Sequence, residues 1–122
     1  MSTEQPVRLG ALEQQVMDAL WDHGPHTVRE IIERLDGRPA YTTIATVFGN
    51  LERKQLVTAT RDGRSVRYAA RHTRDEHAAR LMRHALAASG DRAASILHFI
   101  DTIAPSDLQL LRDYLDERDG GP

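Results

Sequence analysis

Apolar residues recur at helical spacing in three segments of the first half of this 122-residue chain. The recurring positions are Leu9, Leu12, Val16 and Leu20, then Val28, Ile31, Ile32 and Leu35, and finally Ile44, Val47, Phe48 and Leu51. Most neighbours within a set are three or four residues apart, which places them on one face of an α-helix. The pattern therefore predicts helices over residues 9–22, 28–35 and 41–54 that share a core.

Residues that start and stop helices lie between these segments. Gly24-Pro25 ends the first helix, because glycine is a frequent C-cap and proline cannot continue a helix. Thr27 and Glu30 form a capping box, in which both side chains accept backbone N–H groups at the start of the second helix. The sequence Asp-Gly-Arg-Pro at 36–39 ends that helix.

A different period follows the third helix. Residues 57–61 and 65–69 alternate in character and flank the pair Asp62-Gly63. Such a pair between alternating runs predicts a β-hairpin, because glycine readily takes a positive φ. Three helices followed by a hairpin predict a winged helix-turn-helix domain.

The last third of the chain has helical spacing again. Thr73 and Glu76 form a second capping box, and we predict helices over residues 73–89 and 91–103 and a last one that begins at 104–106. The fold class is mainly α with a small β-hairpin. We expect a winged-helix domain at 7–72, a three-helix dimerisation region at 73–118, and flexible ends at 1–6 and 119–122.

Threonine dominates the polar face of the third helix. Threonine is a poor helix former, because its branched β-carbon restricts χ1, and a face meant for solvent more often has Glu, Lys and Gln. In the DNA major groove threonine is useful, because its hydroxyl bonds bases or phosphates and its methyl packs on thymine. From this helix we expect DNA contacts by Thr42, Thr43, Thr46, Asn50 and Arg53.

The charge distribution supports a nucleic-acid partner although the net charge is -2. Residues 38–74 contain eight Arg and Lys against two acidic residues, a balance of +6, whereas residues 75–122 have a balance of -4. Local charge sets the electrostatic footprint. We expect Arg61, Arg64 and Arg67 of the hairpin to hold phosphates; for Arg67 the alternative is a side chain that points away from DNA.

Two aromatic residues, Trp21 and Tyr68, are expected to have structural roles, and a third, Tyr41, has two candidate roles. Tyr68 alternates with Arg67 and should face inward, and Trp21 at the end of the first helix should fill the domain core. Tyr41 stays open between a structural role and a phosphate contact through its hydroxyl.

The last three helices have more apolar side chains than so small a unit can bury alone. Pairing with a second copy would cover the excess, and two-fold symmetry suits a palindromic DNA site. The alternative is that these helices fold back on the first domain. The expected interface residues are Leu81, Ile96, Leu97, Ile100, Leu108, Leu111 and Leu115.

The sequence lacks the motifs that are typical of several functional classes of protein. The chain has no cysteine, and it has no nucleophile elbow, phosphate-binding glycine loop or zinc-hydrolase motif, so we expect no enzyme and no cofactor. Neither a membrane span nor a signal peptide is recognisable, so we expect a cytoplasmic protein. A winged helix that binds only proteins would not need the basic hairpin. The scattered histidines, His72, His77, His84 and His98, leave the alternative of a regulator that responds to a metal or a small molecule.

Four segments resemble the penicillinase-repressor family (BlaI/MecI/CopY type), most densely over residues 9–70. They are Leu-Glu-Gln-Gln-Val-Met-Asp-Ala-Leu-Trp at 12–21, Thr-Val-Arg-Glu-Ile at 27–31, Ala-Tyr-Thr-Thr-Ile-Ala-Thr-Val at 40–47, and Leu51 and Lys54 with Leu56-Val57. The resemblance implies a dimeric winged-helix repressor of a palindromic operator, with Thr43 and Thr46 against DNA.

The resemblance also implies a way of release. Members that respond to β-lactams are cut by a membrane-bound sensor protease in the fifth helix, commonly at Asn-Phe, and the matching pair here is His98-Phe99. Copper sensing through thiolates is excluded, because no cysteine is present. Ala45 stands where some members have a basic residue, so the preferred operator is expected to differ.

Overall fold

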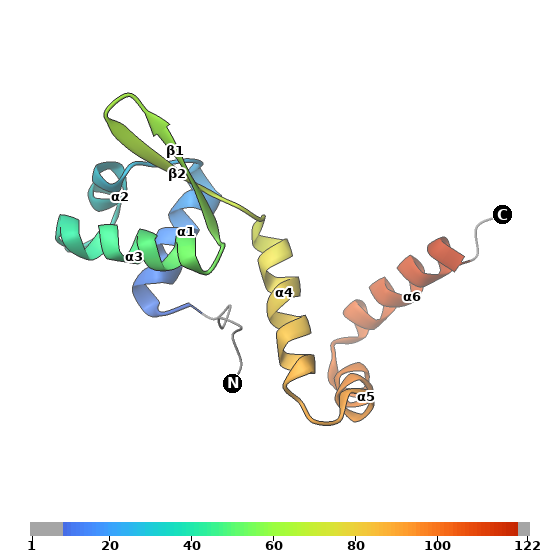
Figure 1. Ribbon diagram of the computed structural model, residues 1–122. Helices are drawn as coiled ribbons and strands as arrows, with labels where there is room; N and C mark the ends of the chain where they lie inside the picture. The colour runs from blue at the N-terminus through green and yellow to red at the C-terminus, as the bar shows by residue number, and fades with distance from the viewer. Residues whose placement is uncertain (1–8, 120–122) are drawn as a thin grey trace. The chain divides into compact units, whose positions relative to one another are not determined.

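In the computed structural model, which describes residues 9–119, the chain forms six helices and one antiparallel hairpin (Figure 1). Their bounds are α1 Ala11–His23, α2 Val28–Arg34, α3 Tyr41–Arg53, β1 Val57–Asp62, β2 Ser65–Ala70, α4 Arg74–Ala87, α5 Arg92–Thr102 and α6 Pro105–Asp119. The predicted fold class, mainly α with a winged helix-turn-helix domain, is confirmed.

Local chemistry places the ends of these elements as predicted. Thr27 Oγ1 accepts the Glu30 N–H at 3.2 Å, and Glu30 Oε1 accepts the Thr27 N–H at 2.9 Å. Thr73 and Glu76 form the same reciprocal pair at the start of α4. Gly24 ends α1 with φ of 88°, a conformation that suits glycine.

The core lies between α1, α2, α3 and the start of β1. Its most buried large side chains are Phe48, Met17, Ile31, Ile44, Leu51, Leu56 and Val16. Each such side chain contributes about 1.5–3 kcal/mol by leaving water. A largely buried ion pair, Lys54 Nζ to Glu13 Oε1 at 3.0 Å, ties the end of α3 to α1. The third helix is therefore held by its apolar face, and its other face is open.

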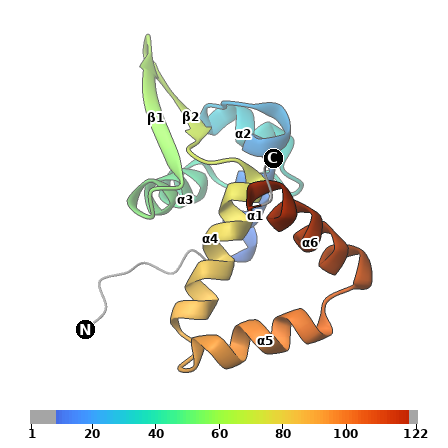
Figure 2. The ribbon, with the colours of Figure 1, turned by 90° about the vertical axis from the view of Figure 1, so that its right-hand side faces the viewer.

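The hairpin is attached to the helices through β2. Its register pairs Val57 with Ala70 and Asp62 with Ser65, so residues 63 and 64 form the turn. On its other edge β2 pairs with His26 in the α1–α2 loop, where the His26 N–H donates to Tyr68 O at 2.9 Å and the Tyr68 N–H donates to His26 O at 2.8 Å. The hairpin projects from this base beyond α2 and α3 (Figure 2).

Trp21 packs against the core, as predicted, and also contacts the start of α4. It lies half-buried at the edge of the core, where its Nε1–H donates to His72 O at 2.8 Å and its ring faces the His77 ring at 5.4 Å. The Arg74 guanidinium lies 5.1 Å from the Trp21 ring centre and pairs with Asp22 at 3.1 Å. Trp21 thus anchors the first turns of α4.

The chain separates into two compact units, residues 1–82 and 83–122, with the division inside α4. Asp119, placed in the flexible C-terminal end by the sequence, is the last residue of α6. The remaining flexible ends predicted, residues 1–6 and 120–122, lie outside the described residues.

The second unit buries little apolar surface. No residue of α5 or α6 is buried. The large apolar side chains exposed in residues 83–119 are Ile96, Leu97, Phe99, Leu110, Tyr114 and Leu115.

Candidate nucleic-acid interface

The exposed face of α3 consists of Thr42, Thr43, Thr46, Gly49, Asn50 and Arg53. Of these Asn50 is half-buried and the others are exposed, whereas Ile44, Val47, Phe48 and Leu51 occupy the opposite, buried face. The helical period places both sets as predicted. All five residues expected to contact DNA from this helix therefore lie on one side of it.

Two of these side chains are bonded to each other. The Arg53 guanidinium donates to Asn50 Oδ1, one turn earlier on the same helix. This bond orients the Arg53 head along the face of α3. At the other end of the helix no described side chain caps the first amides, so the N-terminus presents N–H donors beside Thr42 and Thr43.

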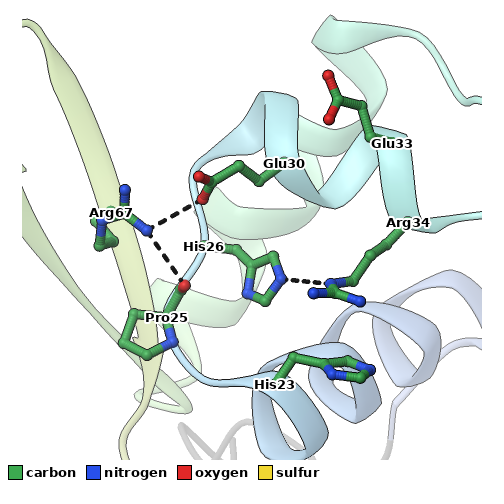
Figure 3. Close-up of a pocket in the computed structure, with 7 residues that line it drawn as sticks. All are labelled: His23, Pro25, His26, Glu30, Glu33, Arg34 and Arg67. Carbon is green, nitrogen blue, oxygen red and sulfur yellow. Dashed lines mark hydrogen bonds and ion pairs between the residues drawn. The ribbon is translucent and has the colours of Figure 1, made fainter.

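The hairpin arginines differ in their surroundings. Arg64 lies in the turn, Arg61 lies on β1 in the second residue pair from the turn, and both are exposed. Arg67 is on the opposite face of the hairpin from Tyr68, and its Nη1 donates to Glu30 Oε1 at 3.1 Å and to Pro25 O at 3.3 Å (Figure 3). Its Nε lies 3.6 Å from an Asp62 oxygen. Protein groups thus hold the Arg67 guanidinium.

Glu30 joins two of these features. The Thr27 backbone N–H and the Arg67 charge lower the pKa of the Glu30 carboxyl, so it stays ionised at neutral pH. One carboxylate therefore caps α2 and holds β2 through Arg67. The sequence showed the cap, but not the partner, which is 37 residues away.

The hairpin and α3 are joined by aromatic stacking. The Tyr68 and Phe48 rings are 4.0 Å apart between centroids and 11° from parallel. Burial raises the pKa of the Tyr68 hydroxyl. The inward orientation predicted for Tyr68 is confirmed, and this contact sets the position of the wing relative to the exposed face of α3.

A shallow polar pocket of about 360 Å³ lies beside α2 and β2 (Figure 3). In it Arg34 Nε donates to His26 Nε2 at 2.6 Å, which leaves the proton of the neutral imidazole on Nδ1, 2.6 Å from Gly24 O. The buried His26 ring is thereby saturated with protein partners. His26 pairs with Arg34, and Glu30 pairs with Arg67, so neither pair offers a polar group to a ligand.

The four histidines on which the metal-responsive alternative rests do not form a metal-binding cluster. Within residues 9–119 no group of three or more His, Cys, Asp or Glu side chains is placed to hold a metal ion. His77 is buried against Trp21, and His98 is exposed on α5. No described helix is long and apolar enough to cross a membrane.

The residues expected to form a dimer lie on α4, α5 and α6. Ile96, Leu97 and Leu115 are exposed, and Leu81, Ile100, Leu108 and Leu111 are half-buried. His98 and Phe99, the candidate cleavage pair, are both exposed in the middle of α5. There the His98 carbonyl accepts the Thr102 hydroxyl at 2.9 Å.

Comparison with protein families gives a match to the penicillinase repressor over residues 9–117. The chain belongs to the penicillinase repressor family. The match spans both units, so the resemblance seen in the sequence is confirmed. Membership identifies a DNA-binding transcriptional regulator of this family and not an enzyme.

Individual relatives agree with the family. The chain is 45% identical over 120 residues to the transcriptional regulator BlaI of Mycobacterium tuberculosis, covering 93% of this chain and 87% of that protein. Among solved structures, the DNA-binding domain of the repressor BlaI matches with a TM-score of 0.52 at 21% identity, covering 61% of this chain and 93% of that one. YusO of Bacillus subtilis matches with a TM-score of 0.50 at 18% identity, covering 93% and 77%. These structural likenesses concern the fold.

Proposed function

We propose that this protein is a homodimeric transcriptional repressor that inserts α3 into the major groove of a palindromic operator. The observation that carries the proposal is the exposed face of α3: polar, rich in threonine, backed by the buried core and joined to the basic hairpin through Tyr68 and Phe48. Thr42, Thr43 and Thr46 read base edges, and Asn50 and Arg53 extend the contact along the groove.

The hairpin supplies phosphate contacts in this proposal. Arg61 and Arg64 are exposed and carry no bond to an acidic group among the interactions of the described residues. Arg67 holds the base of the wing through Glu30 and contributes mainly long-range charge. Phosphate contacts position a protein on the duplex, and base contacts give it sequence preference.

Selection of bound sequences from a random duplex library tests DNA recognition directly. The purified protein should enrich one sequence with two-fold symmetry, with half-sites about one helical turn apart. Binding should weaken steeply as salt rises, because cations on the protein release counterions from the duplex. Enrichment of no sequence at low salt would contradict the proposal.

The dimer is supported by the apolar surface of α5 and α6. A monomer would leave Ile96, Leu97 and Leu115 in water, and a second copy with the same surface can cover them. Leu111→Asp should place a charge in this interface and yield monomers with strongly reduced operator affinity. Sedimentation of the unmodified protein as a monomer at micromolar concentration would contradict the dimer.

Release from DNA is proposed to follow cleavage of the His98–Phe99 bond by a membrane-bound sensor protease in the cytoplasm. Both residues are exposed, and the cut would separate Ile100, Leu108, Leu111 and Leu115 from the DNA-binding unit. The bond lies inside a helix, so cleavage requires local unfolding. Immunoblots of the host under cell-wall antibiotics should show a shortened chain when transcription rises. Derepression with the chain intact would exclude this route.

A further inference from the structure

Gly49 occupies the centre of the exposed face of α3. Thr46 precedes it by three residues and Arg53 follows it by four, so the three lie in one line along the helix. Gly49 is exposed, and no described side chain covers it. If the duplex lies against this face, the middle of the contact has no side chain.

The fold does not require glycine at this position. A Cβ built at Gly49 would meet nothing within 4 Å, and φ here is not positive, unlike that of Gly24, Gly37, Gly63 and Gly90. Glycine is the least favourable residue inside a helix apart from proline. The residue therefore weakens α3 without any compensating contact among the described residues.

The dimensions of the major groove give such a gap a use. The groove is about 12 Å wide, close to the roughly 10–12 Å diameter of a helix with its side chains. A side chain in the centre of the inserted face therefore limits how deeply the helix enters. Threonine side chains are short, so Thr42 and Thr46 reach base edges only if α3 enters deeply.

We propose that Gly49 is the point of closest approach between α3 and the floor of the major groove, and that it determines operator preference. This inference rests on the proposed DNA-binding function. The bare Cα lies against a base edge, and the depth this allows brings the Thr46 hydroxyl and methyl within reach of the neighbouring base. Gly49 was not among the residues expected to contact DNA. The feature of the sequence that could have identified it is a glycine in the interior of a predicted helix.

The test compares Gly49→Ala with the unmodified protein in stability and in binding. The substitution should raise Tm by about 4 °C or more, because alanine favours the helix. Affinity for the operator selected by the unmodified protein should fall about tenfold or more, the scale expected when one base is no longer read. Affinity for a random duplex at low salt should stay the same, because that binding needs charge but not insertion. Gly49→Gln, a longer helix former, should lower operator affinity further.

Gly10→Ala is the matched control. Gly10 is an exposed glycine at the start of α1, and its φ is -68°. A Cβ added there would lie 3.7 Å from Glu13 Oε1, so Gly10 can accept the same methyl group at a position outside α3. Its operator affinity should not change. Equal operator affinity of Gly49→Ala and the unmodified protein would overturn the inference and leave the DNA-binding function intact. If the unmodified protein selects no operator, the function and the inference both fail.

Discussion

Tyr68 of the wing stacks on Phe48 of α3 with ring centroids 4.0 Å apart. Phe48 is fully buried, and the Tyr68 ring of β2 lies against it, while the Tyr68 backbone pairs with His26. This stack and these backbone bonds thereby join the two proposed DNA contacts, the wing and the exposed face of α3, to each other and to the core.

Tyr68→Ala should therefore affect stability and DNA binding together. Loss of a packed aromatic ring from the edge of the core should cost about 2–4 kcal/mol of unfolding free energy. Operator affinity should fall at temperatures where the protein is still folded, because the wing loses its position. Urea unfolding and gel shifts measure the two effects. Tyr68→Phe keeps the ring and should bind as the unmodified protein does; a large loss of binding in that variant would show that the hydroxyl matters and not the stack.

Thr46→Ala and Arg64→Ala should separate base reading from phosphate binding. Thr46→Ala should cost about 1–3 kcal/mol at the operator and relax discrimination at one position in each half-site. Arg64→Ala should weaken all sequences alike and reduce the salt slope by about 0.9 for each phosphate that the protein no longer neutralises. Titrations of operator and random duplex over a range of salt measure both. The reverse pattern would exchange the two roles.

Gln55→Gly should stabilise the protein. Gln55, between α3 and β1, has φ of 64°, a left-handed conformation that costs a residue with a side chain about 1–2 kcal/mol. Glycine removes this strain but adds freedom to the unfolded chain, so the net gain should be about 0.5–1 kcal/mol. Urea denaturation measures it. Gln55→Ala retains the strain and should give no gain; stabilisation by alanine equal to that by glycine would contradict this explanation.

Stability should fall as the pH drops below about 6.5, and His77 should account for part of the fall. Burial, with the charge of Arg80 and the nearby His72, lowers the pKa of His77 below that of the unfolded chain. The unfolded state therefore binds more protons between the two pKa values, so stability is lost as the pH falls through that window. Unfolding by urea at about pH 7.5 and about pH 5.5, on either side of the ordinary histidine pKa, should show a smaller difference for His77→Gln than for the unmodified protein. His98→Gln, at an exposed position, is the control and should keep the full difference.

The amino-acid sequence by itself determined the elements and their exposed and buried faces. Helix period, two capping boxes, Gly24 and the glycine of the hairpin turn, Gly63, are local features, because they involve residues a few positions apart in the chain. The turn itself is Gly63-Arg64, one residue later than the predicted pair Asp62-Gly63, because Asp62 still pairs with Ser65. For the same reason the threonine face of α3 and the inward direction of Tyr68 could be predicted without the structure.

The tertiary structure decided which of these residues meet across long separations. Arg67 was grouped with the phosphate-binding arginines by charge, but it pairs with Glu30 on α2. Trp21 was assigned to the core and packs against it, but its contacts with His72 and His77 at the start of α4 were not predicted. No local pattern encodes these pairings, because they depend on how α1, α2 and β2 pack together.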